Sequence, residues 1–260
     1  MMRFPFYVFA IAVSALPGVA QEAAETPNAQ KFIELAAEEG ERYDFALAGQ
    51  KLKLRAEPVL KWSNPIAGEI YGGVFVWTLQ GRPKLVGSFY KWYHPFTHGT
   101  HEFVSLAEGA LIGNRDGRPV WEPSEPGIKF QPIAGAPVVA GTPTARLTQM
   151  RLLAKQFDVE MTDKDGTVRR LRLLNQPLYR YKLAKADSGD GALFAFANGT
   201  DPETLLLIES KKQTWQYAFT RLNATAMKAS RSKSTAWEVP PLSSQQAYRS
   251  HETYRKFQFD

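Results

Sequence analysis

The chain has no cysteine, and it has only four histidines among its 260 residues. The absence of cysteine excludes a disulfide framework, a zinc–thiolate site, an iron–sulfur cluster and a cysteine nucleophile. After the N-terminal segment, no apolar stretch reaches the roughly 20 residues needed to span a bilayer. A hydrophobic fraction of 44% and a charged fraction of 22% are those of an ordinary globular protein, and they argue against a disordered, collagen-like or coiled-coil chain.

The N-terminus has the pattern of a secretory signal peptide. Arg3 provides a short positive region, residues 4–16 are apolar and uncharged, and a proline with small residues then leads to Ala20. The sequence predicts cleavage after Ala20 and export to the periplasm or beyond. Removal of Arg3 with the peptide lowers the formal net charge from +6 to +5. We expect no transmembrane segment after cleavage.

The predicted export and the mild positive charge narrow the classes of partner. Residues 211–233 combine basic residues with aromatic ones, a composition that occurs in single-strand nucleic-acid sites. Export argues against nucleic acid as the partner, and alternation along strands explains the same pattern with aromatic residues inward and basic residues outward. The expected partner is therefore not nucleic acid but an envelope protein or a polysaccharide, and no cofactor is predicted.

Two helices are predicted within a mainly strand-like chain. Thr26-Pro27 and Thr142-Pro143 each combine an N-cap residue with proline at the first helical position. The first helix should continue to Gly40. In the second, Leu147, Met150, Ala154 and Phe157 recur every three or four residues, which predicts an amphipathic helix over 143–157 whose stripe is core.

An internal repeat is the most informative pattern in the mature chain. Residues 73–81 and 191–199 are apolar segments bounded by glycines eight positions apart, and each is followed by a proline and a further apolar run. Trp121-Glu122 and Trp237-Glu238 end the two copies. The spacing predicts a duplicated β unit in which 59–123 and 173–240 superpose around the helix at 143–157.

These observations predict a mainly β fold, with α+β as the alternative. We expect internally duplicated antiparallel β units, forming a sandwich or a barrel-like structure, with a linking amphipathic helix and an N-terminal helix. Whether the units share one core stays open. The corresponding regions are a signal peptide (1–20), a leader with the N-terminal helix (21–50), a first β unit (51–131), a linker with the helix (132–158), a second β unit (159–240) and a C-terminal tail (241–260).

Several segments also resemble uncharacterised exported proteins of planctomycete-type bacteria. The similarity is carried by Pro177-Leu-Tyr-Arg-Tyr, Asp190-Gly-Ala-Leu-Phe-Ala-Phe, Gly199-Thr-Asp-Pro, Leu206-Leu-Ile-Glu-Ser and His101-Glu-Phe-Val-Ser-Leu. The resemblance implies a bacterial, exported protein. It implies no activity and no catalytic residue.

One cluster of residues could carry chemistry. His94, His98, His101 and Glu102 lie within nine residues, and imidazoles with a carboxylate are suitable zinc ligands. A proline and a glycine interrupt the cluster, so the spacing is that of a loop rather than of a helical metal motif. We therefore expect these four side chains not to form a tight metal site.

Other catalytic patterns are weak. The sequence contains no Gly-x-Ser-x-Gly, and a carboxylate pair such as Glu203 with Glu209 would act in a glycosidase only if folding brought the two groups within about 5–10 Å. The sequence thus predicts no catalytic residue, and it favours an exported, non-catalytic β-rich module that serves binding or structure in the bacterial envelope. The alternative is an exported hydrolase, metal-assisted, that uses the cluster from His94 to Glu102.

Overall fold

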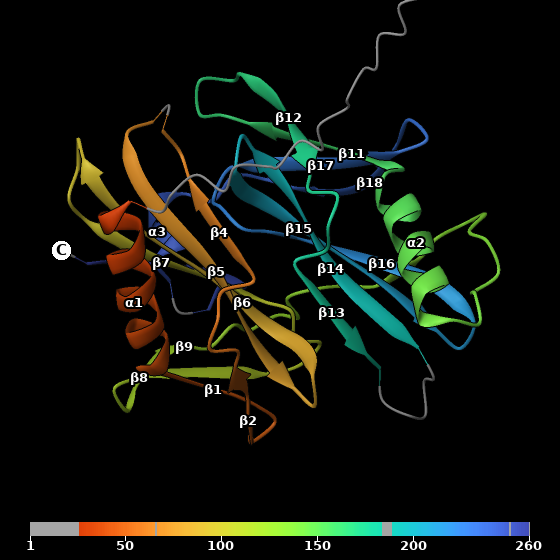
Figure 1. The fold of residues 1–260 in the computed structure, drawn as a ribbon, viewed down its shortest axis with the longest axis horizontal. Helices are drawn as coiled ribbons and strands as arrows, with labels where there is room; N and C mark the ends of the chain where they lie inside the picture. The colour runs from red at the N-terminus through yellow and green to blue at the C-terminus, as the bar shows by residue number, and fades with distance from the viewer. Residues whose placement is uncertain (1–25, 66, 184–188, 250, 260) are drawn as a thin grey trace, which may run out of the picture.

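The computed structural model describes residues 26–65, 67–183, 189–249 and 251–259. The predicted signal peptide and its cleavage site lie outside these residues. The fold is mainly β, with antiparallel pairing throughout the described strands and short helices that include one at the N-terminal end, which confirms the predicted fold class. Two similar halves lie side by side, one around helix α1 and one around helix α2 (Figure 1).

The first half, termed the first unit, covers residues 26–121. It contains α1 (Pro27–Glu41) followed by β1 (Tyr43–Leu47), β2 (Gln50–Lys51), β3 (Lys53–Leu54), β4 (Leu60–Ser63), β5 (Glu69–Leu79), β6 (Arg82–His94), β7 (Gly99–Ser105), β8 (Leu111–Arg115) and β9 (Arg118–Trp121).

The second half, termed the second unit, covers residues 142–239 and repeats this order. It contains α2 (Pro143–Ala154), β11 (Phe157–Thr162), β12 (Val168–Leu173), β13 (Tyr179–Lys182), β14 (Asp190–Asn198), β15 (Asp201–Lys211), β16 (Thr214–Arg221), β17 (Ala226–Arg231) and β18 (Ser234–Val239).

The strand pairings of the two units correspond one to one. The pairs β4–β5, β5–β6, β6–β7, β1–β8 and β8–β9 have as counterparts β13–β14, β14–β15, β15–β16, β11–β17 and β17–β18. The short strands β2 and β3 together take the place of β12. Because such a set of pairings recurs in the same order, the topology shows an internal duplication.

The strand pairings align the two units one residue differently from the alignment of the repeat in the sequence. Gly72 lies opposite Trp62 on β4, and Gly191 lies opposite Tyr181 on β13, so Gly191 corresponds to Gly72 and not to Gly73. A Cβ added at Gly72 would come within 2.0 Å of the Trp62 ring, and one at Gly191 within 2.4 Å of the Tyr181 ring. The feature that the two units share is a glycine under an aromatic ring, and the spacing between glycines in the sequence does not reveal it.

Each unit begins with its helix, which the predicted boundaries at 51–131 and 159–240 leave outside. The Thr26 and Thr142 side chains accept hydrogen bonds from the backbone N–H groups of Ala29 and Ala145, as the cap-plus-proline pattern predicts. Helix α2 ends at Ala154, so the prediction to residue 157 is too long. Phe157 is buried as expected, but it is the first residue of strand β11.

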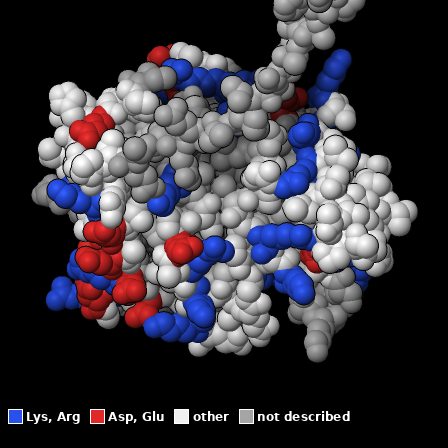
Figure 2. All heavy atoms as spheres, in the orientation of Figure 1, with Lys and Arg blue, Asp and Glu red and all other residues white. Residues whose placement is uncertain are grey.

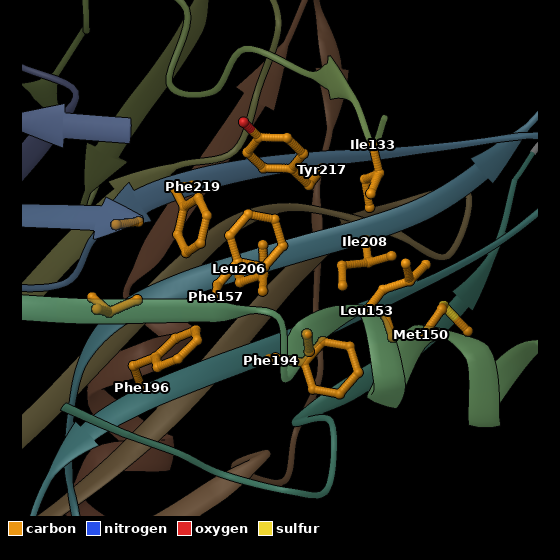
Figure 3. Packing of buried hydrophobic residues seen from close by; sticks show 14 of the residues in the cluster. Ile133, Met150, Leu153, Phe157, Phe194, Phe196, Leu206, Ile208, Tyr217 and Phe219 are labelled. Atoms are coloured by element: carbon orange, nitrogen blue, oxygen red, sulfur yellow. The ribbon is translucent and has the colours of Figure 1, made fainter. Parts of the chain in front are cut away.

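Three apolar clusters fill the molecule in layers. Helix α1 and the strands β1 and β8 cover one face of the sheet of the first unit, where aromatic side chains such as Phe75, Trp77 and Phe103 are buried. In the second unit, Met150 and Leu153 of α2 pack on Phe194 and Ile208 (Figure 3). The third cluster lies between the two units and contains residues of both, including Val76, Val104, Leu193 and Leu207, so the units share a core.

The segment that follows each unit adds a strand to the other unit. After the first unit, β10 (Gln131–Pro132) pairs with β16 of the second. After the second unit, helix α3 (Ser244–Ala247) leads to β19 (Tyr254–Phe259), which pairs with β7 of the first. This reciprocal exchange ties the two halves together, and β19 covers what would otherwise be an exposed sheet edge.

Candidate functional site

The structure does not bring the four residues of the predicted histidine cluster together. His94 is exposed at the end of β6, and the His98 ring lies near the rings of Trp92 and Phe96. His101 and Glu102 are neighbours on β7, and their side chains therefore project to opposite faces of the sheet. Among the described residues, no three His, Asp or Glu side chains are grouped closely enough to hold a metal ion.

His101 belongs to the core of the first unit. It is 1% exposed, its ring lies 4.1 Å from that of Phe89, and its Nδ1 shares a hydrogen bond of 2.9 Å with the Tyr43 hydroxyl. Burial, together with the positive charges of Arg115 and Arg42, lowers the pKa of His101 to about 3. The imidazole is thus neutral at pH 7 and packs as a core side chain.

Glu102 faces the interface between the units, where it is the centre of a polar network. Its Oε1 accepts hydrogen bonds from the hydroxyls of Tyr254 at 2.8 Å and Tyr90 at 3.2 Å, and it lies 3.3 Å from the Lys256 ammonium. Lys256 also donates to the Tyr90 hydroxyl at 3.0 Å. Burial opposes the charged form of Lys256, but the Glu102 carboxylate and the Tyr90 hydroxyl together outweigh burial and raise the pKa of the ammonium. The ammonium therefore keeps its charge.

This network forms one wall of a pocket of about 870 Å³. The first unit contributes β4, β5, β6 and β7. The second contributes the end of β11 with the β11–β12 turn, the start of β15 and the β16–β17 connection, and the C-terminal segment closes the remaining side. The residues that matter for its chemistry are Trp62, Tyr90, Trp92, Glu102, Asp163, Lys164, Asp201, Glu203, Asn223, Tyr248, Tyr254 and Lys256. A pocket of this size, built by two packed units, is typical of a small-molecule site.

Asp201 and Glu203 supply two further carboxyl groups. Asn223 donates a hydrogen bond to Glu203 Oε2. Burial raises the pKa of Glu203 to about 7; the Asn223 hydrogen bond opposes this rise, whereas the charge of Glu102 adds to it. Burial, followed by the charges of Glu203 and Glu102, raises the pKa of Asp201 well above its usual range. Burial thus favours the protonated form of both carboxyl groups.

Aromatic rings provide the apolar part of the pocket. The rings of Trp62 and Tyr90 lie 5.7 Å apart, and Trp92 packs edge-on against Phe96 at 5.2 Å. Phe96 is 54% exposed. Trp62 is 6% exposed, and its buried Nε1–H has no hydrogen-bond partner among the described residues. A buried indole N–H normally finds a hydrogen-bond partner, and this one instead packs against the Gly72 backbone.

Glu203 and Glu209, the carboxylate pair that a glycosidase would need close together, lie far apart. They are six residues apart on β15, which separates them by roughly 20 Å at about 3.4 Å per residue. Glu209 is fully buried, accepts two hydrogen bonds from Arg82 at 3.0 and 3.1 Å, and accepts one from Tyr181 at 2.8 Å. Its charge is satisfied inside the protein.

The sequence predictions missed the part of the site that comes from the C-terminal tail. Tyr254 and Lys256 stand two apart in an alternating stretch, which is a strand signal that the assignment of a tail over 241–260 overlooked. Asp201, which directly follows a Gly-Thr turn, was included in the repeat but not as a site residue. Only long-range pairing brings these residues beside Glu102.

Searches against family models, curated proteins and solved structures find no match for this chain. The resemblance to exported planctomycete-type proteins stays a prediction. None of the helices in the described ranges combines the length and apolar composition that a bilayer crossing requires. On the face shown in Figure 2, acidic side chains gather near α1, whereas Lys and Arg are spread over several elements rather than forming one patch.

Proposed function

We propose that this protein is an exported, non-catalytic binding module of the bacterial envelope, and that it binds a small organic molecule in the pocket between its units. The pocket carries the proposal. It combines a volume of about 870 Å³ with aromatic walls and a fixed Glu102–Lys256 pair. Groups of this kind orient a ligand within an otherwise apolar cavity.

The arrangement supports binding over the hydrolase alternative. That alternative depended on joint action of His94, His98, His101 and Glu102, whose side chains point to different places. In the pocket, Glu102 is held by two tyrosine hydroxyls and a lysine, a network that fixes the wall of a site. Export is supported by the signal-peptide pattern at residues 1–20.

A ligand screen with a blocked pocket tests this function. Thermal unfolding is measured with glucose, cellobiose, amino acids, dicarboxylates, polyols and amines, each in millimolar excess. Ala226→Trp fills the pocket, and Ala110→Trp is the control because Ala110, exposed in the first unit, takes the position that corresponds to Ala226. Circular dichroism first establishes that both variants are folded.

We expect at least one compound to raise the unfolding temperature of the wild type and of Ala110→Trp but not of Ala226→Trp, because only a folded protein with an open pocket gains binding energy. If no compound does so, or if Ala226→Trp responds as the wild type does, the pocket is not a ligand site and the proposal is wrong.

A further inference from the structure

The duplication provides a second copy of the pocket's framework for comparison. Trp62 corresponds to Tyr181, since each lies opposite a glycine on the neighbouring strand. Tyr90 corresponds to Glu209, since these residues lie opposite the same two glycines on the other side. Arg82, the first residue of β6, likewise corresponds to Asp201, the first residue of β15.

The residues that correspond to those of the pocket form a second cluster at the interface between the units. In this second cluster, an arginine side chain fills the interface. The Arg82 guanidinium donates to both oxygens of Glu209 and to Glu108, and it lies 5.4 Å from the centre of the Phe130 ring. Tyr181 and Gln216 complete the hydrogen bonding of Glu209. We call these residues the Arg82 cluster. It shows that the framework accommodates a guanidinium held by carboxylates beside an aromatic ring.

In the pocket, the corresponding position holds the shorter Asp201, which carries a carboxyl group in place of a guanidinium. No arginine reaches in from this position, and the cavity stays open. Of the four carboxylates that line the pocket, Glu102 is paired with Lys256, and Asp163 is paired with Arg169 at 2.5 Å. Asp201 and Glu203 have no cationic partner among the described residues. The remaining charged lining residue, Lys164, is exposed at the rim.

Building on the proposed function, we propose that the ligand is an organic cation whose ammonium or guanidinium group binds Asp201 and Glu203 in the pocket. The ligand supplies the positive charge that Arg82 supplies in the other copy. The aromatic rings of Trp62 and Tyr90 favour the apolar part of such a ligand.

Proton release follows from this arrangement. Asp201 and Glu203 face the charges of Glu102, Asp163 and Lys256, and the nearby Tyr90 and Tyr254 stay neutral because burial raises the pKa of each hydroxyl. Burial raises the pKa of Asp201 and brings that of Glu203 to about 7, so a cation that needs both carboxylates ionised displaces protons as it binds. Its affinity should rise between pH 5.5 and pH 8.

Calorimetric titration with agmatine, spermidine and choline tests the inference. Butane-1,4-diol, glucose and succinate serve as neutral and anionic counterparts, and each titration is repeated in two buffers with different ionisation enthalpies to count protons. The test variant is the double substitution Asp201→Asn with Glu203→Gln. The matched control is Asp163→Asn, which removes a carboxylate of the same pocket that Arg169 already neutralises.

We expect at least one of the three cations to bind with proton release, with a loss of tenfold or more in the double variant and less than threefold in Asp163→Asn. Binding of a neutral or anionic compound that Ala226→Trp abolishes, with no binding of the cations, would overturn the inference and leave the proposed function standing. A cation that binds the double variant as tightly as the wild type would also overturn it. If no compound of either set binds, both proposals fail.

Discussion

Gly72 and Gly191 are equivalent positions of the two units at which packing leaves no room for a side chain. Each lies on the central hairpin of its unit, directly under the ring of a cross-strand aromatic residue, Trp62 or Tyr181. The ring takes the space that a side chain would need. Because Trp62 also lines the pocket, the glycine beneath it sets the position of one pocket wall.

Substitution of either glycine by alanine should therefore destabilise the protein. An added Cβ would lie 2.0 Å from the Trp62 ring in Gly72→Ala and 2.4 Å from the Tyr181 ring in Gly191→Ala. Overpacking of this kind costs about 1–3 kcal/mol. Urea unfolding measures the change. The control is Gly141→Ala, where an added Cβ meets no atom within 4 Å and stability should stay the same or rise slightly. Equal midpoints for all three variants would contradict the packing described here.

Burial of Glu203 in the pocket wall makes the stability of the folded protein depend on pH. Its pKa of about 7 in the folded protein lies above the ordinary value of 4.5, so between these pH values the folded protein holds a proton that the unfolded chain has released. The resulting stability is fully present below pH 4.5 and is lost as the pH rises through 7. We expect Glu203→Gln to be more stable than the wild type at pH 8 by about 2–3 kcal/mol, and similarly stable at pH 4.

Urea midpoints across this pH range test the expectation. Glu125→Gln, on an exposed loop, is the control and should follow the wild type. The buried His101 changes stability with pH in the opposite direction, but it is present in every variant and cancels in the comparison. A constant difference between Glu203→Gln and the wild type from pH 4 to pH 8 would show that folding does not shift the pKa of Glu203.

At the scale of elements, β19 joins the structure to the site. It adds a strand to β7 of the first unit, although it follows the second unit in sequence, and it places Tyr254 and Lys256 in the pocket wall. Tyr254 is 1% exposed and hydrogen-bonds to Glu102. Loss of the strand would expose the edge of β7 and leave Glu102 without Lys256.

A chain that ends at Arg249 should therefore be less stable and should self-associate. Loss of the buried Tyr254 alone should cost about 3–5 kcal/mol, the range for removal of a large core side chain. Thermal unfolding and light scattering measure the two effects, with the exposed substitution Gln258→Ala in the same strand as the control. A truncated chain that stays monomeric and unfolds at the wild-type temperature would show that β19 is dispensable.

Local signals in the sequence predicted individual elements better than their assembly. Thr-Pro pairs mark the first residues of α1 and α2 because capping and proline act within one turn. Glu102 is a pocket residue, but the sequence grouped it with His101, although adjacent strand residues project to opposite faces. The partners of Glu102 on β19 lie about 150 residues away in sequence, and no local pattern indicates such pairing.

At the scale of the whole molecule, two equivalent units are joined by a shared core and by exchanged strands. Strand β10, which follows the first unit, pairs with β16 of the second, and β19, which follows the second unit, pairs with β7 of the first. Their interface is asymmetric where it matters for function, because Arg82 and Glu209 fill it in one copy and the pocket opens in the other. We interpret this asymmetry as the origin of the proposed ligand site.

Cleavage of the connection between the units should leave them associated. A protease site inserted between Pro137 and Val138 lies in an exposed segment, and the cut leaves β10 on the first fragment. Because the two fragments share the central core and both exchanged strands, they should co-elute as one species in gel filtration under native conditions. Each fragment expressed alone should fail to give a stable monomer. Separation of the cut fragments without denaturant would contradict the proposed joining of the units.

A crystal structure with the tightest-binding cation of the titration series tests the central claim most directly. The account predicts density for the ligand in the pocket, with its cationic group within hydrogen-bond distance of Asp201 and Glu203 and with the Trp62 and Tyr90 rings against its apolar part. Ligand density only at a surface site, with the pocket either empty or closed by its own side chains, would contradict the account.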